Sequence, residues 1–482
     1  MLNSKVVTCR LFPLSMAIVI AGSAFCAGQN AGELDLSRIR GTVVPSVSCV
    51  HDPSQSYALY LPSNYSPDRR WPIIYAFDPF ARGKVPVELY KQAAEKYGYI
   101  VAGSNNAKNG PGALEMAAAQ AVWEDTHRRF AIDKDRVYTT GLSGGARFAT
   151  SFALYCYTCS VAGVIAHGAT YPVEEAGAAN DRFLYYVAIG DQDFNLPEVA
   201  ELRAKKEAQG AAFKVKVYPG PHQWAPADVV ENAVAWLELK AMQAGKEKPN
   251  PAFIQEQFQK TQAEATQAEQ AGDTLSEFYA LRSLAVDFKG LVDVSRSESQ
   301  FQTLKKSKEL QHAEKQEKHE IDRQRSLTET AGSDIAGLAQ VGPEQVPVLQ
   351  QRIMSVFDDL RRHLKSTAKD RLIYVRAFNQ LWIQGIEDGE EQYRNREYVR
   401  AANYFQVMAD VAPDQSWPLL LLAETKVREG DKKAALKALD AAVKRGVKSP
   451  LSLTGDPELA PLQADPEFQR IVGKIGKVKS TS

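Results

Sequence analysis

Between residues 46 and 245, short hydrophobic runs alternate with longer stretches that show helical spacing. The short runs are rich in Val, Ile, Tyr and Phe and end in glycine or other turn residues, which is typical of strands. They predict strands at residues 57–61, 71–77, 99–103, 136–141, 161–168, 183–190 and 213–220. Amphipathic stretches at 87–98, 112–130, 197–210 and 227–243 predict the intervening helices. This alternation predicts an α/β domain with a mostly parallel sheet.

The composition changes after Gly245, where "GKEKPNP" is typical of a linker. Residues 252–380 are rich in Ala, Gln, Glu, Lys and Leu, which predicts an all-α region after the α/β domain. The segment from Leu304 to Arg325 carries charges of both signs and has no Pro or Gly. It therefore predicts a solvated helix or a coiled-coil arm rather than a binding patch.

A 34-residue offset relates two stretches near the C-terminus, "YVRAANYFQVMADVAP" and "KKAALKALDAAVKRGV". It pairs Gly389 with Ala423, Ala401 with Ala435, Phe405 with Leu439 and Met408 with Ala442. This period, with small residues where paired helices touch, resembles the tetratricopeptide repeat over residues 382–448. The resemblance implies a surface for a peptide or protein partner, or else a unit that packs on the α/β domain. "LTGDPELAPLQADPEFQRIV" would then be the capping helix of a domain spanning residues 382–475.

The chain has 482 residues, with 58 Lys and Arg against 58 Asp and Glu, so its formal net charge is zero. A neutral chain has no overall field to attract a polyanion, which argues against nucleic acid as a partner. Residues 1–27 place Lys5 and Arg10 before a short apolar stretch that ends in small residues. This pattern predicts a secretory signal peptide.

Cleavage between Ser23 and Asn30 would leave a linker at residues 28–45 and deliver the protein to the periplasm or the exterior. Lipidation at Cys26 and retention of the leader as an anchor are the alternatives. No later stretch is apolar and long enough to predict a transmembrane span.

Three cysteines, Cys49, Cys156 and Cys159, lie beyond the predicted leader. An exported protein can form disulfides, and "CYTC" spaces Cys156 and Cys159 three residues apart. A structural pair, buried or disulfide-bonded, is preferred here over a redox or metal role. The reason is that neither further zinc ligands nor a thioredoxin-like context surrounds the pair.

Ser143 lies in "GLSGG", a G-x-S-x-G pattern between a predicted strand and a predicted helix. The bare pattern is weak, but a strand, a sharp turn and a helix are the setting of a nucleophile elbow. Gly141 and Gly145 would let the strand and the helix approach closely. Ser143 would then stand at the C-terminal edge of the sheet, where active sites of open α/β sheets lie.

A serine nucleophile needs a base, and the base needs a carboxylate to hold its tautomer. In an elbow of this type the order along the chain is serine, acid, histidine, each beyond a strand. "FLYYVAIGDQDFN" supplies Asp193 or Asp191 as the acid, and "KVKVYPGPHQW" supplies His222. Asp193 is preferred because the acid after such a strand commonly follows the glycine as G-x-x-D.

Residues 46–240, with this ordered triad and the opening "YALYLPSNYSPDRRWPIIYAF", resemble the α/β-hydrolase superfamily. Within it they are similar to secreted, lidless esterases of the polyhydroxybutyrate depolymerase and feruloyl esterase type. The resemblance implies acyl transfer with Ser143 as nucleophile, His222 as base and then acid, and Asp193 as its orienting partner. It implies no metal or organic cofactor, because the triad supplies the nucleophile and the proton transfers.

One departure concerns the oxyanion loop, where such esterases have His-Gly and this chain has Asp78 and Pro79. The amide of Gly144 is the expected first donor, and the amide of Phe80 the second, since proline has no N–H. Arg82 could hold an acidic substrate group, although a surface arginine is the simpler interpretation.

Loops at the same predicted edge supply candidate substrate contacts: Asn105, Asn106, Phe194 and Trp224. The substrate would be a small or polymeric ester. Two other functions stay open: a silent hydrolase-fold scaffold that binds a partner through the helical repeats, and a serine peptidase that uses the same residues.

Overall fold

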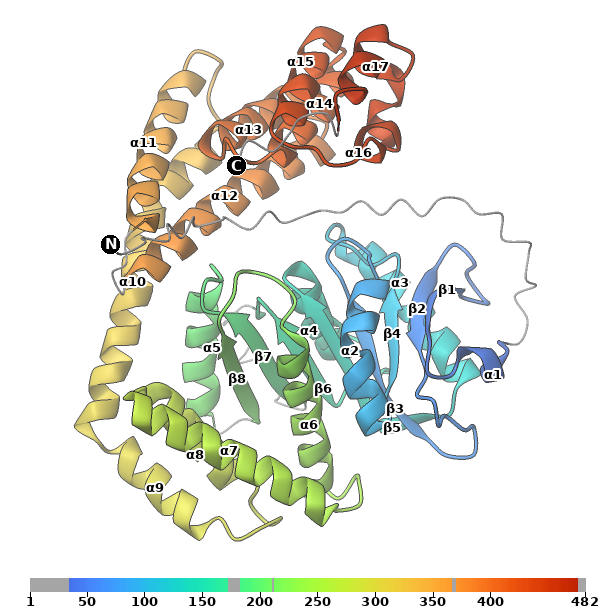
Figure 1. The fold of residues 1–482 in the computed structure, drawn as a ribbon, viewed down its shortest axis with the longest axis vertical. Coiled ribbons are helices and arrows are strands. Elements are labelled where there is room, and N and C mark those ends of the chain that lie inside the picture. Colours follow the sequence, from blue (N-terminus) through green and yellow to red (C-terminus); the bar gives the residue numbers. More distant parts are fainter. Residues whose placement is uncertain (1–33, 172–182, 210–211, 366–369, 476–482) are drawn as a thin grey trace, which may run out of the picture. The chain divides into compact units, whose positions relative to one another are not determined.

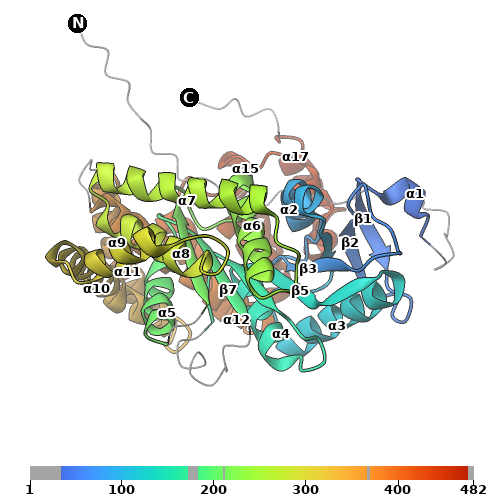
Figure 2. The same cartoon turned by 90° about the horizontal axis from the view of Figure 1, so that it is seen from below.

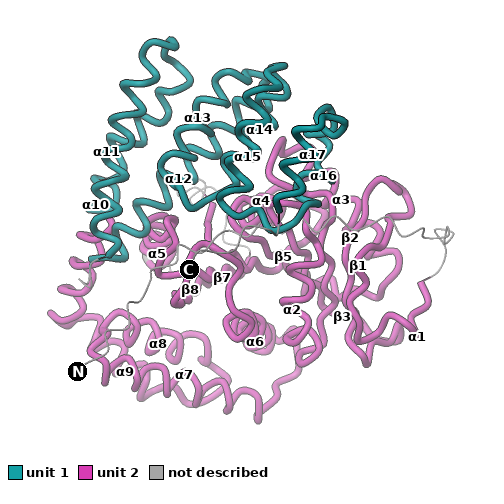
Figure 3. Tube along the Cα trace, turned by 45° about the horizontal axis from the view of Figure 1, so that its top comes forward, with its two compact units in different colours: residues 1–28, 322–482 teal, residues 29–321 magenta. Residues whose placement is uncertain are grey.

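The computed structural model describes residues 34–171, 183–209, 212–365 and 370–475. The predicted leader at 1–27 therefore lies outside the described residues. The chain divides into two compact units, Gln29–Ile321 and Asp322–Ser482 (Figure 3). None of the helices in the described ranges combines the length and hydropathy that a membrane span requires.

The first unit is built on one eight-stranded sheet in the order β1-β2-β4-β3-β5-β6-β7-β8 (Figure 1). β2 runs antiparallel to β1 and β4, and the other neighbouring pairs are parallel. The strands are β1 (Val43–Ser48), β2 (Ser56–Tyr60), β3 (Trp71–Phe77), β4 (Ile100–Ser104), β5 (Ile132–Leu142), β6 (Gly163–His167), β7 (Leu184–Gly190) and β8 (Phe213–Tyr218). All seven predicted strands are present, and the predicted α/β fold class is confirmed.

Helices cover both faces of this sheet (Figure 2). One face carries α2 (Lys84–Tyr97) and α6 (Ala227–Gln243); the other carries α3 (Gly112–Arg129), α4 (Gly144–Tyr155) and α5 (Leu196–Ala208). An apolar core lies on each face of the sheet, and successive strand residues point into the two cores alternately. Ile73 packs with α3 and α4, whereas Ile74 packs with α2 and α6. Because both faces are covered, every residue of β3 is buried, which explains its unbroken apolar run.

A short helix, α1 (Leu36–Ile39), and the start of β1 fall in residues 28–45, the range predicted as a linker. β1 pairs with β2 at the edge of the sheet. Pro45 interrupts its strand pattern, and proline is tolerated there because an edge strand has unpaired amide positions. The α/β domain therefore begins before residue 46.

Three helices beyond the predicted boundary at residue 245 belong to the first unit: α7 (Pro251–Ala271), α8 (Thr274–Asp287) and α9 (Ser295–Lys305). Leu239 and Met242 of α6 share one apolar cluster with Ile254 and Phe278 of these helices. Lys214 of β8 also donates to Ser283 of α8 at 3.0 Å. The composition change at Gly245 therefore marks a change of secondary structure and not the edge of a unit.

The second unit is helical, as predicted. α10 (Lys308–Gly337) contains the boundary between the units, and α9 and α10 divide the predicted charged helix at residues 306–307. The unit continues with α11 (Val346–Leu364), α12 (Arg371–Arg394), α13 (Tyr398–Val411), α14 (Trp417–Glu429) and α15 (Lys432–Lys444).

The 34-residue offset superposes the pair α12 and α13 on the pair α14 and α15. Its paired positions are buried in both copies, including Ala401 and Ala435 at 0% exposure. A side chain at Gly389 would meet Phe405 of the next helix at 2.7 Å, so a small residue is needed there. These contacts agree with the packing role predicted for the small residues.

The prediction of a single capping helix at the end of the second unit is wrong. Its sequence forms α16 (Leu451–Thr454), a 3-10 helix η2 (Pro457–Leu462) and α17 (Pro466–Val472). Gly455 and the prolines that follow interrupt the helical hydrogen bonds. Leu453, Leu459 and Phe468 are nevertheless fully buried, so these short elements cover the end of the helical core.

Candidate active site

Ser143 stands between β5 and α4 in a sharp turn, with φ 54° and ψ −122°. Such a conformation is strained for a non-glycine residue and persists only where the surroundings enforce it. A Cβ on Gly141 would press on the backbone of Gly145, and one on Gly145 would press on the carbonyl of Phe77. The two glycines therefore allow the close strand and helix contact that leaves Ser143 at the tip of the turn.

The amide of Ser143 donates to the carbonyl oxygen of His167, the last residue of β6, at 2.9 Å. The backbone of the turn is thus fixed to the neighbouring strand. The side chain of Ser143 makes no capping hydrogen bond to its own helix. The Ser143 hydroxyl therefore does not cap the N-terminus of α4.

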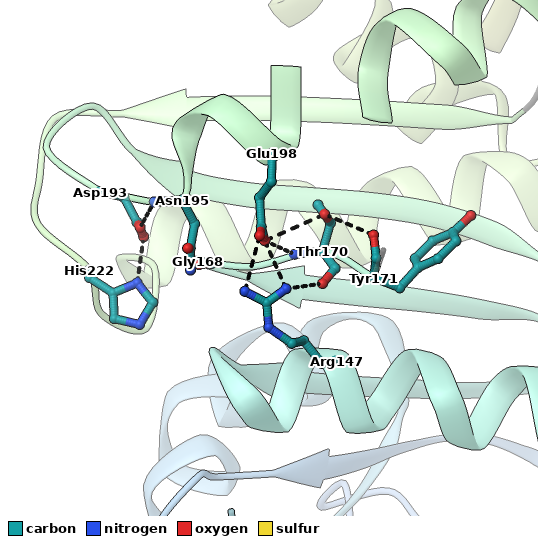
Figure 4. Close-up of polar contacts among 8 residues, drawn as sticks. All are labelled: Arg147, Gly168, Thr170, Tyr171, Asp193, Asn195, Glu198 and His222. Atoms are coloured by element: carbon teal, nitrogen blue, oxygen red, sulfur yellow. Dashed lines mark hydrogen bonds and ion pairs between the residues drawn. The ribbon is translucent and has the colours of Figure 1, made fainter. Parts of the chain in front are cut away.

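His222 and Asp193 form a hydrogen-bonded pair in the loops after β8 and β7, with Nδ1 and Oδ2 2.8 Å apart (Figure 4). Asp193 is fully buried, and its other oxygen accepts from the amide of Asn195 at 2.9 Å. Asp191 instead accepts from the amide of Gly220 at 3.0 Å. Of the two candidate acids, Asp193 has the contact with His222 that an orienting carboxylate needs.

The loop after β8 runs back along the sheet edge toward the serine. The carbonyl of Gly220 accepts from Gln192 beyond β7, and the ring of Trp224 lies 4.9 Å from that of His167 at the end of β6. His222 lies close to Gly168, the residue after His167, because a Cβ on Gly168 would lie 3.0 Å from His222 Nδ1. The ring of Phe194 lies 4.5 Å from that of His222 and so borders the pair.

Gly168, next to His167, leaves room for this pair. Its φ is +65°, and a Cβ there would lie 2.9 Å from Asp193 Oδ2 and 3.0 Å from His222 Nδ1. Its carbonyl accepts from the side chain of Asn195 at 2.8 Å. A side chain at residue 168 would therefore clash with His222 in its observed position.

A charged clamp holds the segment that follows Gly168 (Figure 4). Arg147, on the first turn of α4, donates to the carbonyl of Thr170 at 2.7 Å and to both oxygens of Glu198 on α5. Glu198 in turn accepts from the amide of Thr170 at 2.7 Å. The helix that begins at the serine and the helix that follows the acid are thereby tied through one loop.

The predicted oxyanion loop is organised by Asp78, which is buried directly after β3. Its carboxylate accepts from Arg82 Nε at 2.8 Å and Nη2 at 2.9 Å, and from the indole of Trp224 at 3.0 Å. It also accepts from the amide of Phe80 at 3.0 Å. The N–H expected to serve as second oxyanion donor is thus already bonded within the loop, and the prediction for Phe80 has to be corrected on this ground. Arg82, predicted as a surface or substrate-binding group, pairs with this carboxylate.

Asn105 and Asn106 have other partners than those predicted. Asn105 donates to the carbonyl of Pro45 at 3.2 Å, and Asn106 both accepts from the amide of Ser56 and donates to the carbonyl of Ser54. Their amides fasten the edge of the sheet. We therefore leave them out of the proposed substrate contacts.

Asn109, in the same loop, was missed by the sequence interpretation. Its amide group lies against the Cα of Gly144, where an added Cβ would meet Oδ1, Cγ and Nδ2 of Asn109. Its backbone amide donates to the carbonyl of Pro79 at 2.9 Å. The only signal in the sequence is a third asparagine in "NNAKNG", and nothing local distinguishes it from the first two.

His167 is a buried neutral histidine beneath the site. The amide of Ala225 donates to its Nδ1 at 3.4 Å, so Nε2 carries the proton and donates to the hydroxyl of Tyr90 at 2.8 Å. Tyr90 and Thr140 continue the chain to a strand carbonyl. Burial lowers the pKa of His167 from 6.5 to about 3. The imidazole therefore stays uncharged under the turn that holds Ser143.

The three cysteines beyond the predicted leader differ in their bonding. Cys156 and Cys159 form a disulfide after α4, whereas Cys49 is a buried free thiol. Among the described residues, no group of three or more His, Cys, Asp and Glu side chains is arranged to hold a metal ion. The disulfide agrees with the structural interpretation of Cys156 and Cys159.

No protein-family model matches the chain, and no curated protein matches it. Solved structures that resemble it include S-formylglutathione hydrolase (FrmB) from Staphylococcus aureus, at 14% identity and TM-score 0.32 over 38% of this chain and 92% of that chain. A ferulic acid esterase is 16% identical, with TM-score 0.36 over 41% of this chain and 97% of that chain. Porphyromonas gingivalis dipeptidyl peptidase 4 is 13% identical, with TM-score 0.31 over 40% of this chain and 34% of that chain. Scores this low carry no argument about activity. Independently of them, the strand order and the turn at Ser143 give the first unit the fold of an α/β-hydrolase domain.

Proposed function

We propose that this protein is an exported serine hydrolase that cleaves carboxylic esters through an acyl-enzyme. The observation that carries the proposal is the strained turn at Ser143, whose amide is bonded to His167, together with the hydrogen-bonded pair of His222 and Asp193 against Gly168. Backbone strain at a half-buried serine between a strand and a helix is expected where the side chain must be presented to a substrate.

The proposed chemistry uses only these side chains. His222 donates its Nδ1 proton to Asp193 in a hydrogen bond, so Nε2 is left as the base. As Ser143 Oγ bonds to the acyl carbon, its proton passes to Nε2, which then gives the proton to the departing alcohol. Water attacks the acyl carbon next and loses its proton to Nε2. Breaking the acyl bond then releases the acid, and the same proton restores the serine hydroxyl.

Export to the periplasm or the exterior is the second part of the proposal. It is supported by the leader pattern with Lys5 and Arg10 and by the disulfide between Cys156 and Cys159. Disulfides persist in oxidising compartments and are rare in the cytosol.

One observation favours a rival function. Because Asp78 holds the amide of Phe80, the domain could be a silent scaffold whose 34-residue helical repeats bind a peptide or protein partner. A serine peptidase is the other rival, because it would use the same triad. The partner of the helical unit remains a proposal in each case.

Fluorophosphonate labelling of the purified mature protein, with peptide mapping, separates these functions. An active serine hydrolase is expected to carry the label on Ser143, and Ser143→Ala should lower ester turnover by about 10⁴-fold or more. Folded protein that neither labels nor hydrolyses esters would support the scaffold. Faster turnover of peptides than of matched esters would support the peptidase.

A further inference from the structure

The loop between β4 and α3 contains three asparagines, and one of them has a side chain that stays unused. The amides of Asn105 and Asn106 are bonded to the edge of the sheet. Asn109 is exposed, and no hydrogen bond of its side chain occurs among the described residues. An amide group has two N–H donors, so Asn109 has donors to offer a ligand.

The backbone of Lys108 and Asn109 is held beside the nucleophile turn. The antiparallel bridge between Phe80 and Lys108 and the bond from Asn109 N to Pro79 O attach this stretch to the oxyanion loop. The side chain then reaches Gly144, where an added Cβ would lie nearest Oδ1 of the Asn109 amide and 2.7 Å from its Nδ2. Asn109 therefore lies beside the residue whose amide is the expected first oxyanion donor.

The oxyanion loop itself has no spare N–H at residues 79–81. Pro79 has none, the amide of Phe80 donates to the Asp78 carboxylate, and the amide of Ala81 donates to the Asp78 carbonyl at 2.9 Å. A tetrahedral intermediate of acyl transfer is stabilised by donors aimed at its oxygen. With Gly144 alone, one backbone donor of the usual set would be lacking.

We propose that the side chain of Asn109 is the second oxyanion donor of this site, in place of a loop amide. This inference rests on the proposed serine hydrolase function. When Ser143 Oγ bonds to the acyl carbon, the carbonyl π electrons move to the carbonyl oxygen. Gly144 N–H and Asn109 Nδ2–H bind that oxygen until the charge returns and expels the alcohol. Because the charge exists only on the way to and from the intermediate, the contribution falls on kcat more than on KM.

Two substitutions at residue 109 test the donor directly. Asn109→Ala removes the amide, and Asn109→Asp keeps its size but replaces both N–H donors with an ionised oxygen. Each is expected to lower kcat by about 100- to 1,000-fold with KM changed by less than about threefold. Asn106→Ala is the matched control, since it removes the same group from the same loop, and its kcat should stay within a few-fold of the parent.

A transition-state analogue gives a second readout. A trifluoromethyl ketone forms a tetrahedral adduct with the serine, and its affinity should fall about 100-fold in Asn109→Ala, in step with kcat. Asn109 is exposed, so circular dichroism and thermal unfolding should match those of the parent. If both variants keep the parent's kcat and inhibitor affinity while Ser143→Ala is inactive, the role of Asn109 is overturned and the hydrolase function stands. A parent that neither labels nor hydrolyses esters overturns both.

Discussion

The indole Nε1 of Trp224 donates to Oδ2 of Asp78 across 3.0 Å, although the two residues are 146 positions apart in the chain. Asp78 begins the oxyanion loop after β3, and Trp224 follows His222 by two residues in the loop after β8. One buried carboxylate therefore joins the loop that should bind the substrate oxygen to the loop that carries the histidine.

Removing this carboxylate should loosen both loops. Asp78→Ala leaves the Phe80 amide and the Trp224 indole without their acceptor, and we expect a loss of about 3 kcal/mol in the free energy of unfolding. Trp224→Phe removes one of these hydrogen bonds and should cost less, about 1 kcal/mol. Urea unfolding of the two variants measures the difference. Equal stability of Asp78→Ala and the parent would contradict the joining role.

Two adjacent glycines in the nucleophile turn should respond differently to the same change. In Gly145→Ala the new Cβ would press on the Phe77 carbonyl, whose carbon would be 3.0 Å away. Because backbone cannot yield there, we expect about 4 kcal/mol of destabilisation or a failure to fold. In Gly144→Ala the three atoms nearest the new Cβ all belong to the Asn109 side chain, which can turn away. This variant should fold, with a lower kcat if Asn109 is displaced. Thermal unfolding and ester assays on both variants measure the difference. Equal stabilities of the two variants would contradict the prediction.

Gly168→Ala should impair catalysis more than it impairs folding. Its Cβ would approach Asp193 Oδ2 and His222 Nδ1 to about 3 Å, so the histidine must shift. A shift of this kind is expected to lower kcat by about 100-fold. Gly272→Ala is the matched control, because Gly272 has a similar φ of +69° with open space around it. Both variants should lose about 1–2 kcal/mol from the left-handed backbone. A parent-like kcat in Gly168→Ala would refute the steric role.

The buried His167 should make stability depend on acid. Its pKa is about 3 in the folded protein against an ordinary 6.5, so below pH 6.5 the unfolded chain binds a proton that the folded protein does not. The stabilisation is complete above pH 6.5 and is lost as the pH falls toward 3, at about 1.4 kcal/mol per pH unit. His167→Asn should flatten the plot of unfolding free energy against pH by that slope. His51→Asn, in an exposed loop, is the control, and an unchanged slope in His167→Asn would contradict the prediction.

Much of the first unit was predictable because its signals are local. Strands such as Trp71–Phe77 and Leu184–Gly190 are unbroken apolar runs that end in turn residues, and their burial on both faces requires that composition. The order of Ser143, Asp193 and His222 follows from the same strands, because parallel strands bring their C-terminal ends to one edge. The preference for Asp193 over Asp191 came from spacing alone, and the hydrogen bond to His222 agrees with it.

The partners of individual polar side chains were not predictable. Asn105, Asn106 and Asn109 have the same chemistry within five residues, and only the folded chain assigns the first two to the sheet edge and the third to Gly144. The sequence left the Phe80 amide available as an oxyanion donor, but in the folded protein it donates to the buried carboxylate of Asp78. Likewise, α7 to α9 differ in composition from the α/β domain, yet their apolar residues share a cluster with α6.

The sequence by itself therefore determined the strands, the turn at Ser143 and the order of the candidate triad, because hydrophobic period and glycine position act over a few residues. Tertiary structure alone decided which donors remain near Gly144, how Trp224 meets Asp78 and where the first unit ends. The physical reason is that a buried hydrogen bond or apolar contact pairs groups that are distant along the chain. The local sequence around one partner does not identify the other.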